Sequence, residues 1–346
     1  MPPLSRVHAF AGGPPPPKGA WLRRLPLALL LVLLATPRWA GEVRRAASTG
    51  PVALEAEPVA LDADRPALRR VGALTYLGGV VLRARDPAFG GYSALAVEGE
   101  RFTLLNDRGG LLTFRMGGDW RPRGARLADL PGGPGTGWRN EHRDSESLAH
   151  DPATGRWWVA FENWNEVWRY SSGFSTAERA RAPAAMRRWR DAGGPESIVR
   201  MRDGRFVLVA ETTRPPRGRG RDGLIFAGDP TDPRAVSQRF SYRPGPRGFD
   251  PVDMAELPDG RVMVLERRFR LPFRWSNRIA LVDRGAIRPG AAVRGREVAR
   301  LAAPLPHDNF EGLAVAREGG ATVLWLVSDD NQLLLQRTLL LKFRLG

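Results

Sequence analysis

Residues 309–331 read NFEGLAVAREGGATVLWLVSDDN: a short strand, a glycine turn and a strongly apolar strand that ends in acidic residues. The glycines supply the positive φ angles that tight hairpins need. The same form recurs at 92–109, 144–163, 195–212 and 251–268. Each stretch is followed by a third apolar run, such as LLTFRM or RIALVD. The chain therefore contains five related units that are each built on a hairpin.

The spacing of the units distinguishes among all-β architectures. One position at the start of each first strand recurs about every 55 residues, and such a period is typical of a β-propeller. A sandwich or barrel does not require equal spacing. The orphan strand pair at 70–83 is expected to complete the last blade and close the ring. We predict a β-propeller of four-stranded antiparallel blades, with five blades favoured; six would need residues 51–92 to form a divergent first blade.

The N-terminal region precedes the repeats. Arg23 and Arg24 lead into an apolar run, 25–35, which has the length of a signal-peptide core and is too short to span a bilayer. The predicted boundaries are a signal peptide or N-terminal anchor over 1–40, an irregular linker over 41–67 and the propeller domain over 68–346. The chain has no cysteine, which suits an oxidising compartment. We expect a periplasmic or extracellular protein that meets a membrane only through its N-terminal segment.

The formal net charge of +16 suggests nucleic-acid binding at first sight. Almost all of this charge is arginine, since only Lys18 and Lys342 are lysines, and the arginines are scattered through every unit. No helix-turn-helix, zinc-finger or RNA-binding signature accompanies them. We therefore expect no nucleic-acid partner, and a monomer that acts on a small phosphorylated or ester substrate.

Two sets of mostly acidic residues recur with the repeat. The first set, at the start of strand one, is Ser93, Glu146, Glu196, Asp253 and Glu311. The second, at the end of strand two, is Asp107, Glu162, Glu211, Glu266 and Asp329 or Asp330. Strand two of an antiparallel pair ends where strand one begins, so both sets are expected at one mouth of the central channel. Carboxylates crowded there repel one another by several kcal/mol unless they are neutralised.

Either a cation or arginine neutralises such a ring. The first set offers only oxygen ligands, which suits Ca²⁺ better than Zn²⁺, so we predict that Ser93, Glu146, Glu196, Asp253 and Glu311 hold a Ca²⁺ ion with a catalytic or a purely structural role. A cation beside guanidinium groups is what a phosphate ester needs. The predicted catalytic residues are Glu211, Glu266, Arg267 and His307, and the predicted substrate-binding residues are Arg108, Arg214 and Arg268.

Several stretches resemble a known family. The runs GGPESIVRMRDGRFVLVAE, LPDGRVMVLERRF and the closing block DNFEGLAV, SDDNQ and QRTLLLKFRL are similar to the phytase-like family, also called "esterase-like activity of phytase". This resemblance runs from about residue 68 to the C-terminus. It implies a secreted propeller and hydrolysis of phosphomonoesters or esters. The order Ser, Glu, Glu, Asp, Glu is also similar to the axial Ca²⁺ ring of calcium-activated nucleotidases, although Asp253 stands where that pattern has Ser.

Three functions remain open on the sequence. The first is a Ca²⁺-dependent hydrolase of phosphoesters that acts at the central mouth. The second is a non-catalytic binding or scaffold propeller with a structural ion. The third is a metal-dependent lactonase. No G-x-S-x-G motif is present, so a serine esterase of the α/β-hydrolase type is unsupported.

Overall fold

The computed structural model describes residues 49–346, apart from 138, 140–141, 247, 272–273 and 334. The predicted signal peptide or anchor over 1–40 lies outside the described residues. Within them, no helix combines the length and the apolar character that crossing a bilayer requires. The described part of the chain is all-β, and its strands form five separate sheets.

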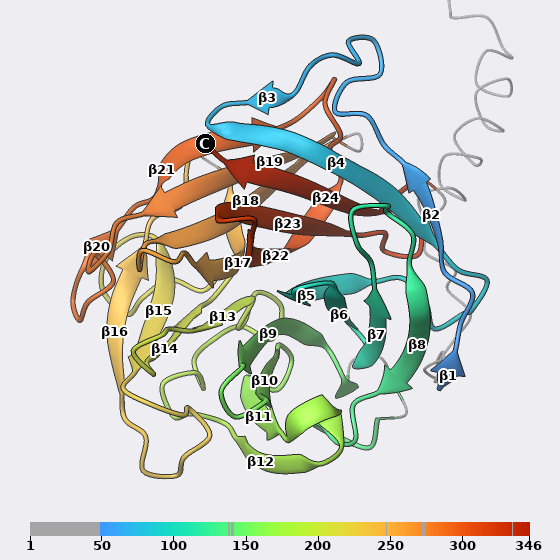
Figure 1. The fold of residues 1–346 in the computed structure, drawn as a ribbon. Coiled ribbons are helices and arrows are strands. Elements are labelled where there is room, and N and C mark those ends of the chain that lie inside the picture. The colour runs from blue at the N-terminus through green and yellow to red at the C-terminus, as the bar shows by residue number, and fades with distance from the viewer. Residues whose placement is uncertain (1–48, 138, 140–141, 247, 272–273, 334) are drawn as a thin grey trace, which may run out of the picture. The chain divides into compact units, whose positions relative to one another are not determined.

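The sheets follow one another along the chain as the blades of a propeller (Figure 1). The first blade contains β5 (Tyr92–Glu98), β6 (Arg101–Asn106), β7 (Gly110–Arg115) and β8 (Arg123–Asp129). The second contains β9 (Ser145–Asp151), β10 (Arg156–Phe161), β11 (Glu166–Tyr170) and β12 (Ala177–Arg181). The third contains β13 (Ser197–Arg200), β14 (Phe206–Val209), β15 (Arg221–Phe226) and β16 (Ser237–Tyr242). The fourth contains β17 (Asp250–Glu256), β18 (Val262–Arg270), β19 (Arg274–Val282) and β21 (Arg296–Leu301).

The fifth blade joins the two ends of the propeller. It contains β22 (Asn309–Glu318), β23 (Ala321–Asp329) and β24 (Thr338–Leu345), followed by β4 (Leu74–Arg83). Strand β4 pairs antiparallel with β24 from Leu82 opposite Thr338 to Leu74 opposite Leu345. The predicted ring closure by the segment 70–83 is therefore confirmed, as is the five-bladed count. Residues 51–92 build no sixth sheet, because their strands join the first and fifth blades.

Short strands extend three of the blades. In the segment expected to be an irregular linker, β1 (Gly50–Pro51) pairs with β8 and β2 (Glu55–Pro58) pairs with β4. β3 (Arg70–Val71) also pairs with β4, and β20 (Ala292–Val293) pairs in parallel with β16. These additions lie beyond the outermost long strands, where they cover edges that would otherwise present unpaired backbone groups.

The apolar core is divided among the five interfaces between neighbouring blades. Phe102, Leu104 and Trp325, for example, lie in the cluster between the first and fifth blades, and Val264 and Val207 lie in the one between the third and fourth. The remaining three interfaces have similar clusters. Because apolar side chains face both neighbours, the polar side chains at the inner ends of the blades are held on a rigid ring.

Candidate functional site

The repeated position at the mouth is a β-bulge. In four of the inner strands the register with strand two shifts by one residue, and the residue that is skipped is Ser93, Glu146, Val252 or Glu311. The fourth unit therefore places Val252, and not Asp253, at the predicted position. A bulge turns one side chain out of the pleat, so the residue next to it faces a different way. Asp253 therefore lies next to the bulge and not on it, and its predicted role as a metal ligand stays a prediction.

Asp253 instead holds two blades together. Its buried carboxylate accepts hydrogen bonds from the backbone N–H groups of Met254 and Leu313, both at 2.7 Å. Leu313 lies on β22, the inner strand of the next blade. Ser93 also makes a hydrogen bond between blades: its Oγ donates to the carbonyl oxygen of Ser145, in the next blade, at 2.6 Å. These two side chains are used in contacts between inner strands.

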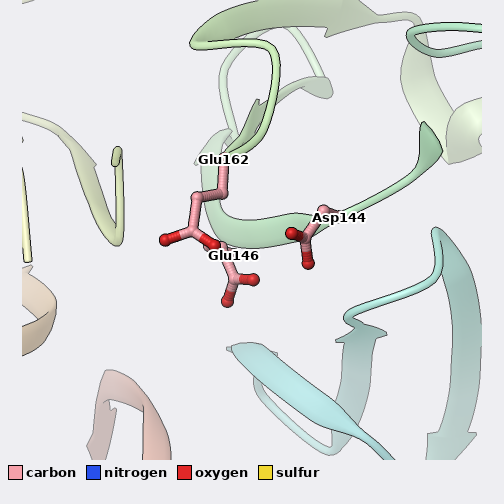
Figure 2. A group of neighbouring side chains, drawn as sticks. All are labelled: Asp144, Glu146 and Glu162. Carbon is pink, nitrogen blue, oxygen red and sulfur yellow. The ribbon is translucent and has the colours of Figure 1, made fainter. Parts of the chain in front are cut away.

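Five carboxylates from the second and third blades form the acidic cluster: Asp144, Glu146, Glu162, Glu196 and Glu211. One oxygen each from Asp144, Glu146 and Glu162 lie within 4.8 Å of one another, and the same holds for Glu162, Glu196 and Glu211. Figure 2 shows the carboxylates of the first three gathered together beside the inner strand β9. Glu162 belongs to both groups. The sequence predicted two ligands of this cluster, Glu146 and Glu196; Asp144 was missed, although it lies only two residues before Glu146.

Burial and mutual repulsion act together in this cluster. Burial raises the pKa of Glu196 well above its usual range, and the charge of Glu211 adds to the effect. The pKa of Glu146 is also raised well above its usual range, by burial first and then by Glu196 and Asp144. Two carboxylates 4.8 Å apart repel by about 3 kcal/mol at an effective dielectric constant of 20. The cluster therefore strongly favours anything that supplies positive charge.

Glu162 is fixed by the backbone of the following blade. Its Oε1 accepts hydrogen bonds from the N–H groups of Gly193 and Gly194, the second at 3.1 Å. Burial raises the pKa of Glu162, while these two N–H groups act in the opposite direction. The loop before β13 therefore determines where the shared carboxylate of the cluster lies.

Arg267, on β18, supplies one positive charge to the site. Its guanidinium donates to Glu211 at 2.9 Å, to Asn309 Oδ1 at 2.7 Å and to Glu311. Burial alone would lower the pKa of Arg267, but Glu211 and Glu196 outweigh it, so the pKa is raised and the group stays charged. Glu311, predicted as a metal ligand, is thus paired with arginine. Arg267, predicted to be catalytic, does lie at the mouth with Glu211.

A second acidic pair lies where the first and fifth blades meet. Burial, together with the charge of Asp107, raises the pKa of Asp329 to about 8. Burial, partly offset by Arg108, raises the pKa of Asp107 to about 6. Arg108 lies 3.2 Å from Asp107 and also donates to the carbonyl oxygen of Gly90. The predicted substrate-binding residue Arg108 is therefore engaged in the first blade.

Glu266 does not join the mouth, because it is fully buried toward the third blade. Its carboxylate accepts hydrogen bonds from Arg278 at 2.7 Å, Tyr242 at 2.5 Å and the N–H of Gly245 at 2.9 Å. Its carboxylate is thus held by one ion pair and two further hydrogen bonds. None of these partners belongs to the acidic cluster, and the catalytic role predicted for Glu266 stays a prediction.

The remaining predicted residues lie in different environments. His307 is half-buried, and its Nδ1 lies 2.7 Å from the carbonyl oxygen of Leu305. Arg214 is exposed on the loop after β14. Arg268 lines a cavity of about 300 Å³ together with Glu211, Arg267 and Glu311. Of the three predicted substrate-binding arginines, Arg268 is the one that the structure brings to the same cavity as Glu211.

The inner strands change character along their length. Beyond the acidic end, Leu95, Leu148, Ile198, Met254 and Leu313 line a cavity of about 680 Å³, one from each inner strand. The same cavity is also lined by Glu98, Asp151 and Glu256, each of which lies within 4.0 Å of a basic side chain. Among the described residues, the grouped carboxylates lie at the other end, where the inner strands begin.

Comparison with known proteins identifies the family of this chain. Residues 87–332 match the family described as phytase-like, "Esterase-like activity of phytase". The chain belongs to this phytase-like family. No protein with a curated description matches it.

Solved structures similar to this phytase-like chain share little sequence with it. They include glutaminyl cyclase from Myxococcus xanthus, with 12% identity, a TM-score of 0.43 and coverage of 88% of this chain and 98% of that one. The PQQ-bound aldose sugar dehydrogenase from Streptomyces coelicolor has 13% identity, a TM-score of 0.42 and coverage of 77% and 97%. A putative 6-phosphogluconolactonase from Bacteroides fragilis has 12% identity, a TM-score of 0.36 and coverage of 75% of each chain. No functional conclusion follows from likeness at this level.

Proposed function

We propose that this phytase-like propeller is an exported, metal-dependent hydrolase of phosphate esters, and that it acts at the acidic cluster and the adjoining cavity. The observation that carries the proposal is the presence of two sets of three carboxylates that share Glu162; in each set, one oxygen per residue lies within 4.8 Å of the others. The family's name supports ester hydrolysis in general. At the opposite end of the inner strands, the carboxylates of Glu98, Asp151 and Glu256 each lie beside a basic side chain.

The donor set of the cluster fits a hard divalent cation. Carboxylate oxygens are the ligands Ca²⁺ prefers, and the cluster contains neither sulfur nor imidazole ligands among its five members. Asp144, Glu146, Glu162, Glu196 and Glu211 would hold the ion. When bound, such an ion polarises a phosphoryl oxygen and lowers the pKa of a bound water molecule.

The chain's own side chains supply the rest of the site. Arg267 holds Glu211 and Glu311 on either side of its guanidinium, which fixes both carboxylates at the cavity wall. Asn309 supports Glu311 through an Nδ2 hydrogen bond of 2.8 Å. Arg268, on the same wall, offers a planar set of donors that suits the oxygens of a phosphoryl group.

The test uses the mature protein and a panel of phosphomonoesters and lactones. We expect phosphate release that is abolished by EDTA and restored by Ca²⁺. Glu162→Gln and Glu196→Gln should each reduce the rate of this release by at least 100-fold, since one lost electrostatic contact at a site of charge development costs about this much. Glu100→Gln, an exposed carboxylate in the first blade, is the matched control and should retain full activity. A Ca²⁺-loaded protein that is inert toward every phosphomonoester would contradict the proposal, and turnover of lactones alone would replace it with a lactonase.

One observation favours a second candidate, a non-catalytic propeller with a structural ion. Glu162 already connects the second blade to Gly193 and Gly194 of the third through hydrogen bonds. An ion held by Glu162 and Glu196 would strengthen this same junction. In that case Ca²⁺ would raise the melting temperature, and no substrate of the panel would be turned over.

A further inference from the structure

The fourth blade has a hairpin whose strands extend well past the acidic cluster. Strands β18 and β19 have nine residues each, against four to six in the corresponding strands of the second and third blades. Arg267 on β18 contacts the cluster through Glu211, and β18 continues for three more residues. Their pairing places Phe269 directly opposite Trp275.

Phe269 and Trp275 form an aromatic wall beside the cavity. Their ring centroids are 4.7 Å apart with the ring planes inclined at 47°. Both line the cavity of about 300 Å³ to which Glu211 and Glu311 also contribute. Phe269 is 44% exposed, which is unusual for a phenylalanine on a paired strand in a propeller whose other large apolar side chains are mostly buried. An apolar surface is thus available immediately next to the charged groups.

Arg268 presents an unused positive charge at the same cavity. In the described part of the chain its Nε is buried without a hydrogen-bond partner. Its guanidinium lies 4.5 Å from the Phe249 ring, and that of Arg300 lies 5.2 Å from the same ring. Burial lowers the pKa of Arg268, and the like charges of Arg270 and Arg300 lower it further. An anion placed here would relieve this repulsion.

Resting on the function proposed above, we infer that the substrate is an aryl phosphomonoester, whose ring lies against Phe269 and Trp275 while its phosphoryl group pairs with Arg268. Phe269, Trp275 and Arg268 all line this one cavity, and so does Arg267, whose guanidinium lies 5.9 Å from the centroid of the Trp275 ring.

The experiment measures binding, which does not depend on turnover. Calorimetric titration of the Ca²⁺-loaded protein with phenylphosphonate and methylphosphonate compares two ligands that share a phosphonate group and are not hydrolysed. We expect the phenyl compound to bind about tenfold more tightly, the size of effect that one added aromatic contact gives. In the double variant Phe269→Ala and Trp275→Ala the two ligands should bind equally, whereas Arg268→Gln should weaken both about tenfold and keep their ratio.

Two control variants match the changes closely. Leu271→Ala removes a side chain that is 84% exposed on the same hairpin and does not line the cavity, so the tenfold preference should persist. Arg115→Gln removes an exposed guanidinium in the first blade, which does not line the cavity, and should leave both affinities unchanged. Melting temperatures close to that of the unmodified protein show that each variant is folded.

The outcomes separate this inference from the proposed function. Equal affinity of the unmodified protein for both phosphonates, or a preference that survives in the double variant, overturns the inference. Turnover of phosphomonoesters without any aryl preference would leave the proposed function standing alone. A phenyl preference in a protein that hydrolyses nothing would keep the aromatic anion site and reject the hydrolase.

Discussion

Replacing Glu196 by Gln should make the protein more stable than the unmodified protein without Ca²⁺ and less stable than it with Ca²⁺. Glu196 is 4% exposed and faces Glu162 and Glu211 with oxygens no more than 4.8 Å apart. Each of these two contacts costs about 3 kcal/mol at an effective dielectric constant of 20, and the attraction to Arg267 offsets roughly one of them, which leaves about 3 kcal/mol for the ionised carboxylate. The raised pKa of Glu196 lets the metal-free protein avoid part of this cost by taking up a proton, so an uncharged amide of the same shape should raise its free energy of unfolding by about 2 kcal/mol.

With Ca²⁺ present the order of stabilities should change. A ligand that binds only the folded state adds about 2.7 kcal/mol when its free concentration is 100 times its Kd. The unmodified protein should gain this amount, and Glu196→Gln should gain little because the cluster has lost one of its ligands. In EDTA the variant should thus melt roughly 4 °C higher than the unmodified protein, and in saturating Ca²⁺ it should melt lower.

Scanning calorimetry or fluorescence melts in EDTA and in Ca²⁺ provide the measurement. Glu100→Gln, whose carboxylate is exposed and lies 3.9 Å from Arg115, serves as the control and should change neither melting temperature by more than about 1 °C. If Glu196→Gln melts below the unmodified protein in EDTA and still responds fully to Ca²⁺, then like-charge crowding does not govern this site, and the reasoning fails.

Three other substitutions test the surrounding structure. Asp253→Asn can satisfy only one of the two N–H groups that the carboxylate now accepts, so urea titration should show a loss of about 1–3 kcal/mol, with an unchanged Ca²⁺ response. Glu266→Gln leaves the buried guanidinium of Arg278 without its main partner and should cost about 3–5 kcal/mol, while the specific activity of the folded fraction stays the same. Burial lowers the pKa of His150 in the folded protein. As the pH falls below 6.5, the imidazole therefore takes up its proton in the unfolded chain before it does so in the folded protein. Stability should decline from that pH down to the folded pKa, and His150→Gln should remove this decline in pH-dependent melts.

The fold followed from the sequence because the propeller repeats its local chemistry. Glycine turns mark every central hairpin, and the apolar strands recur at a regular interval. The segment 70–83 belongs to no unit of its own, and the last unit lacks an outer strand, so the two are expected to pair, as they do. The edge strands β1 and β2 could not be anticipated in this way. They consist of two and four residues with no alternation, and they form because an outer edge is available to pair with them.

Part of the site was predictable and part was not. Glu146, Glu196, Glu211 and Arg267 were placed at the mouth because strand ends meet there. Whether arginine or a metal ion neutralises each carboxylate could not be predicted, because this depends on which side chains are in contact. Arginine is so frequent in this chain that proximity in sequence could not show that Arg267 takes Glu211 and Glu311 while Arg278 takes Glu266.

The placement of Asp253 in the recurring acidic set has a more general cause. Strand one was aligned by residue type, and an acidic residue in the fourth unit was matched to the acidic residues of the others. The hydrogen-bond register shows that the recurring feature is the bulge, which Val252 occupies there. A bulge is required by the geometry of the inner strand, whereas its side chain is free to vary. The bulge therefore recurs at four of the five inner strands, and the side chains that depart from five-fold equivalence determine which part of the mouth is acidic. Ser93 is uncharged, Val252 is buried in the core and Glu311 is paired with Arg267, so the grouped carboxylates lie on the second and third blades. An ion is therefore expected off the axis, toward Glu162.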